Sequence, residues 1–437
     1  MANGISKLVD PVIVIPGITG TGLHDEYPVD HEKVWSVILR KYDRVALHPD
    51  NLKYEADEPA RIKPDQIFGV AYNSLIEELH HNLSEKADRE VPVYPFGYDW
   101  RMPLEIIENE LDAFITEVIE RTKLSRHYHN EGYKDNAKVN LIGHSMGGLL
   151  INGYLANKKQ DAPVNKIVTL ATPFRGSFEA LMKISVGVGD WGFQDKGSRE
   201  REIARLTPAL YYLLPAFRKG ITVEEGIPET LFDPDAWQPS VTETIEEFIR
   251  MKGLPSDDVH ERAAVIFRDL LNKAGEHNRK ISSFTLEQAG LDKSKWMAIA
   301  GVNSETMVKL SIIRKDEHVE FKISDDNREN KWGNADPEEA RMTGDGTVPF
   351  EGAVPYFLNE SNLVCVTPQD YSYWETGERA LSSVAGFHGI LPNMNLIHRL
   401  IVRFFKDLGD ERETTWGHKA PGVIEWYPPI KLKEGKE

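Results

Sequence analysis

A serine between glycines is the first group in this sequence that could do covalent chemistry. Ser145 lies in Gly-His-Ser-Met-Gly, residues 143–147, which matches the pattern Gly-x-Ser-x-Gly. The pentapeptide alone is a weak signal, because glycine and serine are common residues. Its surroundings are more specific: residues 137–142 alternate like a strand, and residues 148–156 have a helical pattern. Strand, sharp turn and helix in this order are typical of a nucleophile elbow.

A serine hydroxyl needs a base to take its proton and a carboxylate to orient that base. In hydrolases with a nucleophile elbow, the acid and then the histidine follow the serine along the chain. Asp345 is the preferred acid, because it lies in the glycine-flanked loop of residues 343–349, past the middle of the chain. Asp336 and Asp326 are kept as reserves, since they lie among charged residues that are typical of a solvated surface.

Three histidines follow Asp345 and compete for the role of base. His388 lies in Gly-Phe-His-Gly, residues 386–389, in a predicted loop after the last predicted strand. His398 falls inside a helical pattern, and His418 lies in a polar tail. The order of the motif therefore predicts His388 as the base.

Acyl transfer also needs N–H donors for the negative oxygen of a tetrahedral intermediate. One donor is expected to be the backbone N–H of Met146, directly after the nucleophile, and the other to come from a loop after an early core strand. Residues 17–20, Gly-Ile-Thr-Gly, form such a loop, and Ile18 is the expected donor. Glycines on either side would let this backbone approach a substrate closely.

The elements that must position these residues alternate along the chain. Strands are predicted at residues 11–16, 91–95, 137–142, 166–171, 296–301 and 363–366, and helices at 103–123, 148–156 and 393–408. This alternation indicates βαβ units and a mainly parallel sheet. The expected fold class is α/β, of the α/β-hydrolase type, with helices on both faces of the sheet.

The pattern changes between residue 176 and about residue 295. Segments such as residues 209–214 and 260–271 have helical patterns, separated by proline, glycine and charged residues. We expect residues 1–175 and 296–437 to form the α/β-hydrolase core, and residues 176–295 to form an inserted, mostly helical cap. Residues 306–323 alternate like a β-hairpin.

Composition excludes some classes of partner. The 437 residues include 52 Lys and Arg against 69 Asp and Glu, a net charge of −17. Such a surface repels nucleic-acid backbones and anionic headgroups, so nucleic-acid binding and simple electrostatic membrane docking are disfavoured. The one cysteine, Cys365, lies in an apolar run that reads as a buried strand, and it has no partner for an intrachain disulfide.

No cofactor and no metal are expected. His127 and His129 could place two imidazoles near a metal, but no cysteine or carboxylate completes the set at ligand spacing. No stretch has the length of a transmembrane helix, and residues 1–10 lack the apolar region of a signal peptide. The expected compartment is the cytoplasm; secretion stays open for a natural chain that begins upstream of Met1.

Several motifs taken together resemble the lecithin:cholesterol acyltransferase-like hydrolases, a family that includes phospholipases and acyltransferases. They are Pro-Gly-Ile-Thr-Gly (16–20), Tyr-Asp-Trp-Arg (98–101), Gly-His-Ser-Met-Gly-Gly (143–148), Thr-Pro (172–173) and Gly-Asp-Gly-Thr-Val-Pro (344–349). The resemblance spans roughly residues 11–400, but residues 177–295 carry none of these motifs.

This resemblance implies a triad and an oxyanion hole made by the residues already singled out: Ser145, Asp345 and His388, with Ile18 and Met146. It also implies a mobile lid over the site. Trp35 is the lid candidate, as an apolar contact for substrate, with packing in the core as the alternative. The chain lacks the disulfide cysteines of the secreted members, so water is a simpler acceptor than a sterol.

The leading hypothesis is a serine carboxylic-ester hydrolase that acts on apolar acyl esters through an acyl-enzyme. Apolar segments of the expected cap, residues 186–191 and 210–214, favour a lipid or other apolar ester, with transient contact to a membrane or micelle. Two alternatives stay open. One is a phospholipase or acyltransferase of the same family, and the other is a catalytically silent binding protein on this scaffold.

Overall fold

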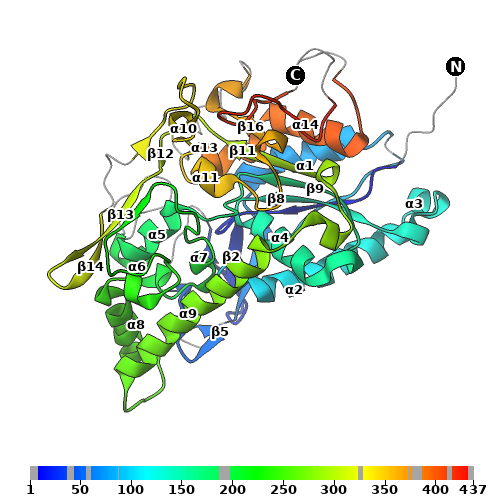
Figure 1. Cartoon of the computed structure of the whole chain (residues 1–437). Coiled ribbons are helices and arrows are strands. Elements are labelled where there is room, and N and C mark those ends of the chain that lie inside the picture. Colours follow the sequence, from blue (N-terminus) through cyan, green and yellow to red (C-terminus); the bar gives the residue numbers. More distant parts are fainter. Residues whose placement is uncertain are drawn as a thin grey trace, which may run out of the picture.

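The fold is built on a six-stranded parallel sheet, seen near the centre of the computed structural model in Figure 1. The strand order is β16–β11–β9–β8–β1–β7. These strands span Val364–Val366, Trp296–Gly301, Val164–Leu170, Val139–His144, Val12–Ile15 and Val93–Pro95. The structure describes residues 8–36, 44–55, 61–86, 88–186, 197–322, 328–372, 375, 386–410 and 416–431.

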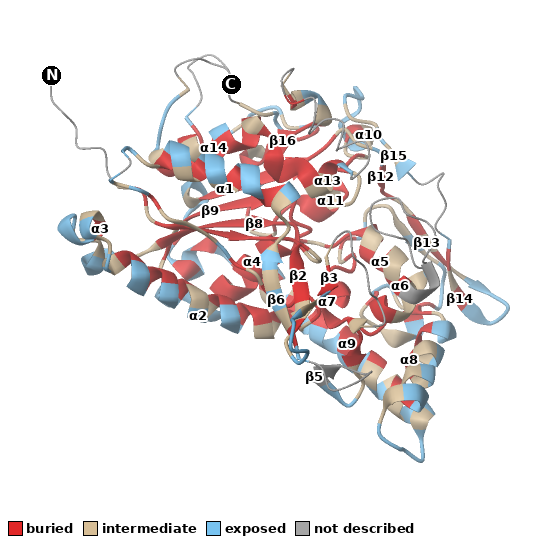
Figure 2. Cartoon of the chain, turned by 180° about the vertical axis from the view of Figure 1, so that it is seen from behind, coloured by how far each residue is buried: buried red, intermediate tan, exposed pale blue. Residues whose placement is uncertain are grey.

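Two layers of helices enclose this sheet, which confirms the predicted fold class. Helices α1 and α14 lie on one face and α2 and α4 on the other (Figures 1 and 2). In β1, Val12 and Val14 pack toward α1 and α14, while Ile13 and Ile15 pack toward α2 and α4. Because both faces are covered, the strand is apolar at every position rather than at alternate ones. The four helices span Gly69–Leu83, Asn395–Lys406, Leu104–Lys123 and Met146–Lys158.

Between β9 and β11, the described residues form five α-helices and a short strand. These are α5 (Phe178–Ser185), α6 (Gly197–Ala204), α7 (Pro208–Tyr211), β10 (Ile221–Val223), α8 (Pro239–Lys252) and α9 (Val259–Ser282). Helix α9 runs eleven residues past the predicted end at Leu271. Its later turns are rich in polar residues, which weaken the helical pattern, yet they bury Ala274, His277 and Ile281.

The predicted hairpin at residues 306–323 is present as β13 (Leu310–Lys315) and β14 (His318–Lys322). Strand β10 pairs with β13, so the hairpin joins a three-stranded sheet with a segment of the predicted cap. Division of the chain at residues 176 and 295 stays a prediction, and this sheet links the two sides of the second boundary.

The remaining elements are short, and several were not predicted. Ahead of α1 are β2 (Thr21–Asp25), β3 (Glu32–Trp35), β4 (Leu47–His48), β5 (Asn51–Glu55) and β6 (Ile62–Ile67). Strands β3, β2 and β6 form an antiparallel sheet, and β4 pairs with β5. The others are α3 (Arg126–Asn130), β12 (Thr306–Met307), β15 (Arg328–Glu329), α10 (Pro337–Ala340), α11 (Phe350–Ala353) and α13 (Phe387–Ile390).

A buried carboxylate ties α9 to the helices beneath the sheet. Glu108 of α2 is 1% exposed and contacts His277 Nε2 at 2.6 Å and Lys280 Nζ at 2.8 Å, both from α9. Asn157 of α4 donates to the same carboxylate at 2.8 Å. Burial alone would raise the pKa of Glu108, but the hydrogen bonds and charges of His277 and Lys280 outweigh it and hold the pKa below its ordinary value. The carboxylate is therefore a stabilising anion only while these partners surround it.

We expect Glu108→Gln to unfold in urea at pH 7 with a free energy lower by about 3 kcal/mol, because the Lys280 ammonium loses its buried carboxylate partner. The depressed pKa gives stability that is present above the unfolded value of 4.5 and is lost as the pH falls through the folded value. The wild type should therefore lose stability more steeply than the variant below about pH 4.5. The exposed Glu90, paired with His80, supplies the control Glu90→Gln, and equal slopes in all three proteins would contradict the assignment.

Candidate active site

Ser145 lies in a strained turn at the carboxyl end of β8. It precedes α4 directly and has φ 53° and ψ −126°, a backbone conformation that residues other than glycine rarely adopt. Its N–H donates to the carbonyl of Leu170 at the end of β9, at 2.8 Å. The turn therefore places the serine at the edge of the sheet where parallel strands end and where such folds bind ligands.

The glycines of the pentapeptide are required by close backbone approaches. A Cβ on Gly143 would lie 2.6 Å from the backbone nitrogen of Gly148. A Cβ on Gly147 would lie 2.4 Å from the carbonyl oxygen of Ile15 in β1. Side chains at either position would push α4 away from the sheet, and the serine would move with it.

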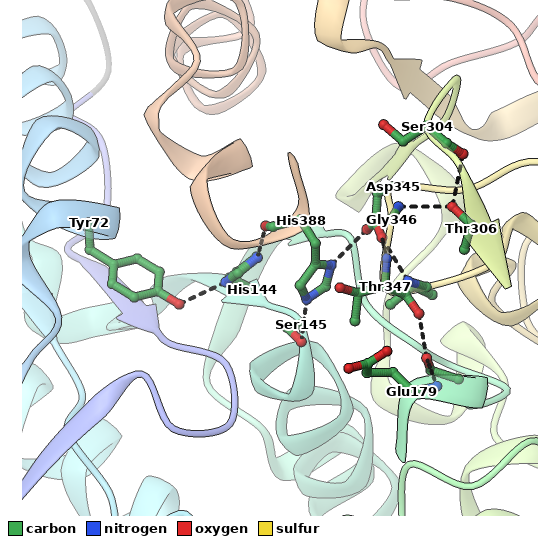
Figure 3. Close-up of polar contacts among 12 residues, drawn as sticks. Tyr72, His144, Ser145, Glu179, Ser304, Thr306, Asp345, Gly346, Thr347 and His388 are labelled. Atoms are coloured by element: carbon green, nitrogen blue, oxygen red, sulfur yellow. Dashed lines mark hydrogen bonds and ion pairs between the residues drawn. The ribbon is translucent and has the colours of Figure 1, made fainter. Parts of the chain in front are cut away.

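The structure brings Ser145, His388 and Asp345 together, although they are up to 243 residues apart in the chain (Figure 3). His388 Nε2 lies 2.9 Å from Ser145 Oγ, and His388 Nδ1 lies 2.7 Å from Asp345 Oδ2. The carboxylate accepts a hydrogen bond from the Nδ1–H group of His388, which leaves the lone pair on Nε2 to accept a hydrogen bond from the serine hydroxyl. This arrangement can withdraw a proton from Ser145 as the oxygen attacks an electrophile.

Asp345 is held rigidly in the loop between α10 and α11. It is 1% exposed, and its Oδ1 accepts the N–H groups of Thr347 at 2.9 Å and Val348 at 2.7 Å. Thr306 Oγ1 accepts the next N–H, that of Gly346, at 2.9 Å (Figure 3). With Oδ1 occupied by backbone donors, Oδ2 is directed at the imidazole.

The competing residues make other contacts. His398 Nε2 bonds to the carbonyl of Pro392 inside the core, and His418 pairs with Asp370. Asp336 is exposed and caps the first turn of α10 through the N–H of Glu338. Asp326 lies outside the described residues.

The two expected oxyanion donors flank Ser145. Met146 opens α4, so its N–H belongs to the first helical turn, where no intrahelical carbonyl is available. Ile18 lies in a turn closed by the Gly20 N–H on the Gly17 carbonyl at 3.1 Å, with Thr19 at φ 60°. Ile18 and Ser145 line the same cavity. Their role as donors stays a prediction.

The Tyr-Asp-Trp-Arg motif, residues 98–101, contacts the backbone directly before the loop of residues 17–20. Asp99 and Arg101 form a buried ion pair, in which the carboxylate accepts from the guanidinium at 2.9 Å (Nε) and 2.7 Å (Nη2). Tyr98 donates its hydroxyl to the carbonyl of Pro16 at 2.8 Å, directly before the turn. The motif thus contributes to the site through the position of a backbone loop.

The cavity at Ser145 is mostly apolar, with two charged side chains from α5. Its lining includes Ile18, Phe68, Ala71, Tyr72, Pro173, Glu179, Ala180, Lys183, Leu210, Leu213, Val348 and His388. The Lys183 ammonium lies 3.8 Å from a carboxylate oxygen of Glu200. The Glu179 carboxylate lies on the side that faces Ser145 in Figure 3. No local sequence pattern distinguishes Tyr72, Glu179 or Lys183. These residues come from α1 and α5, and only the cavity that they line together marks them.

Trp35 does not lie among the described residues that line this cavity. It is 2% exposed and packs against Trp100, with ring centroids 4.9 Å apart. The lid role is therefore not supported, and the alternative, packing in the core, fits its position. Most of the apolar segment 186–191 lies outside the described residues.

A metal site or a membrane-spanning helix would be recognisable in the described part of the chain. There, no three His, Cys, Asp or Glu side chains gather as a metal site would need, and His127 contacts the carbonyl of Glu90 at 2.8 Å. Within the same residues, no helix combines the length and apolar content needed to cross a bilayer.

Comparison with known proteins gives one family. The model of the lecithin:cholesterol acyltransferase family matches residues 62–318, a range that contains Ser145 and ends before Asp345. The chain is 36% identical over 198 residues to phospholipase A(1) LCAT3 of Arabidopsis thaliana, and 26% identical over 209 residues to lecithin-cholesterol acyltransferase-like 4 of that plant. These matches cover 38% and 39% of this chain, but only 42% and 35% of the two relatives.

A solved structure shares the fold. The chain superposes on one from "The crystal structure of Tle4-Tli4 complex" with a TM-score of 0.57 and 14% identity, covering 91% of this chain and 98% of that one. At that identity the likeness concerns the fold alone.

A fluorophosphonate should label Ser145, with an Oγ–P bond formed and fluoride released. We expect His388→Ala to slow labelling by about 100-fold or more, because the hydroxyl loses its base. Peptide mass mapping after timed labelling measures both. Ser294→Ala, at an exposed serine outside the cavity lining, is the control and should label like the wild type. Label retained by Ser145→Ala would contradict the assignment.

Proposed function

Because the chain belongs to the lecithin:cholesterol acyltransferase family, we propose that it hydrolyses carboxylic esters of lipids through an acyl-enzyme on Ser145. The observation that carries this proposal is the hydrogen-bonded row of Ser145, His388 and Asp345 in a cavity with apolar walls. A hydrogen-bonded triad of this kind supplies the nucleophile, the base and the orienting acid that acyl transfer needs.

In the first half of the reaction, Ser145 Oγ attacks the ester carbonyl carbon while His388 Nε2 takes its proton. Asp345 accepts the hydrogen bond of the Nδ1–H group, stays ionised and stabilises the imidazolium. The carbonyl oxygen becomes negative and receives the N–H groups of Ile18 and Met146. The bond to the leaving alkoxide then breaks, and the imidazolium proton passes to that oxygen. The acyl group stays on Ser145.

Water completes the cycle by the same steps in reverse order. His388 takes a proton from water as its oxygen attacks the acyl carbonyl, and the proton returns to Ser145 Oγ when the fatty acid leaves. Transfer to an alcohol would use the same acyl-enzyme, with the alcohol in place of water. We propose water as the acceptor. A silent binding protein would have no need for Asp345 to be fixed by two backbone donors.

A phospholipid is the more specific substrate candidate, and Lys183 favours it. Lys183 lines the cavity together with apolar residues such as Leu210 and Leu213, and its ammonium lies 3.8 Å from Glu200, so one substrate could place its acyl chain and its phosphate there. Lysine is a common partner of phosphate oxygens in proteins. The 36% identical relative is described as a phospholipase A(1), in agreement with this candidate.

Ester hydrolysis tests the proposed function directly. We expect the wild type to hydrolyse p-nitrophenyl esters of medium and long acyl chains, and Ser145→Ala to be at least about 1,000-fold slower. Asp345→Asn should be slower by a similar factor, because the imidazole loses its orienting acceptor. Asp336→Asn, the reserve acid, is the matched control and should keep wild-type activity. Equal rates for wild type and Ser145→Ala would refute the proposal.

The phospholipid candidate predicts a change in selectivity. For Lys183→Met we expect kcat/KM on mixed micelles of phosphatidylcholine to fall about tenfold relative to that on a neutral diacylglycerol, because the phosphate loses a cation. Lys315→Met, on the exposed hairpin β13–β14, controls for the change in net charge. An unchanged ratio of the two substrates in Lys183→Met would remove the support for phosphate recognition.

A further inference from the structure

Two buried residues at the site have no part in the mechanism above. Tyr72 of α1 is 2% exposed, and His144, the last residue of β8, is 4% exposed. The Gly17 N–H donates to Tyr72 Oη at 2.9 Å, Tyr72 Oη lies 2.7 Å from His144 Nδ1, and His144 Nε2 lies 3.0 Å from the backbone oxygen of His388 (Figure 3). These contacts form one continuous chain from the loop before Ile18 to the peptide of the base.

The direction of each hydrogen bond in this chain follows from chemistry. A carbonyl oxygen can only accept, so His144 Nε2 must carry a proton. Burial holds the pKa of His144 well below its ordinary 6.5, and the charge of the His388 imidazole lowers it further. The hydrogen bond to the His388 carbonyl acts in the opposite direction but does not outweigh them. The ring is therefore neutral with its single proton on Nε2, and Nδ1 must accept.

Tyr72 then has only one possible role. Its hydroxyl donates to His144 Nδ1, and its oxygen accepts the N–H of Gly17. Burial raises the pKa of Tyr72, which keeps the hydroxyl protonated. Every donor in the chain has one acceptor, so the bonds reinforce one another in a dry interior.

Both ends of the hydrogen-bond chain are backbone groups beside those that the proposed reaction uses. Gly17 directly precedes Ile18, and its own N–H is bound to Tyr72, so it is directed away from an oxyanion. At the other end, His388 lies in α13, a helix of only four residues. Its peptide is fixed by two contacts: its N–H donates to the Asp345 carbonyl at 3.1 Å, and its carbonyl accepts from His144.

We propose that Tyr72 and His144 are positioning residues that hold the oxyanion loop and the base loop in fixed register across Ser145. Neither residue exchanges a proton with substrate in this role. The kinetic consequence rests on the proposed ester hydrolysis, whereas the hydrogen-bond chain itself does not. The histidine of Gly-His-Ser-Met-Gly thereby has a function separate from that of the serine beside it.

The variant Tyr72→Phe distinguishes a hydrogen-bonding role of Tyr72 from a role in packing alone. The Tyr72 and His144 rings meet edge to face at 5.7 Å, a contact that phenylalanine keeps while it loses the hydroxyl. We expect kcat on a p-nitrophenyl ester to fall about 10- to 100-fold with little change in KM, because displaced reacting groups slow the chemical step. The rate of fluorophosphonate labelling should fall by the same factor.

Variants of His144 provide a second kinetic test. His144→Leu should fall about as far as Tyr72→Phe, and the double variant should be no slower than the slower single variant, since both break one chain. His144→Gln can again donate an amide N–H to the His388 carbonyl, so it should recover part of kcat. Multiplicative losses in the double variant would indicate independent roles and overturn the proposal.

A matched control and a readout without turnover complete the experiment. Tyr128→Phe removes an equally buried hydroxyl from α3, away from the cavity lining, where Tyr128 donates to the Val9 carbonyl at 2.7 Å; this variant should keep wild-type kcat. In ¹⁵N spectra of labelled histidines, His144 should be neutral with its proton on Nε2, and Tyr72→Phe should shift the ring signals of both His144 and His388.

The outcomes separate the two proposals. A wild type without Ser145-dependent turnover would refute ester hydrolysis, while the spectra would still decide the hydrogen-bond chain. An active wild type with kcat unchanged in Tyr72→Phe would overturn the positioning role. So would a His144 that is protonated on Nδ1 at neutral pH.

Discussion

The turn between β8 and α4 is the constraint on which the rest of the site depends. Ser145 has a positive φ there, and the glycines around it let backbone from β1, β8 and α4 approach without side chains. A conformation of this kind persists only when the surrounding structure holds it in place. The six parallel strands and their four covering helices provide that support, and they bring the loops after β1, β8 and β11 to one edge.

Two polar residues buried at the site, Asp345 and His144, are each fixed by backbone partners as well as by side chains. Asp345 binds two N–H groups, and His144 binds the peptide of His388. Desolvated polar groups cost free energy unless they are paired, so each contact also selects one geometry. Glu108 serves the same purpose at a distance from Ser145, where it joins α9 to α2. Buried charge here specifies how segments remote in sequence are placed.

The family match and the geometry support different parts of the account. The matched range, residues 62–318, contains Ser145 and α5 but neither Asp345 nor His388. Those two residues are tied to the serine by hydrogen-bond distances alone. The family and the cavity, whose lining includes apolar residues and Lys183, support a lipid substrate. The geometry of the triad supports the acyl-enzyme mechanism.

The sequence by itself determined the strand–turn–helix around Ser145, because hydrophobic period and glycine spacing are local signals. It also indicated Asp345 and His388, since chain order limits the choice of acid and base. It could not find Tyr72, Glu179 or Lys183, whose neighbours in sequence lie in ordinary helices. It left Trp35 between two roles, and burial against Trp100 decided for the core. Contacts between residues 72 and 144, or 144 and 388, are set by how helices and loops pack on the sheet, and no local pattern records that packing.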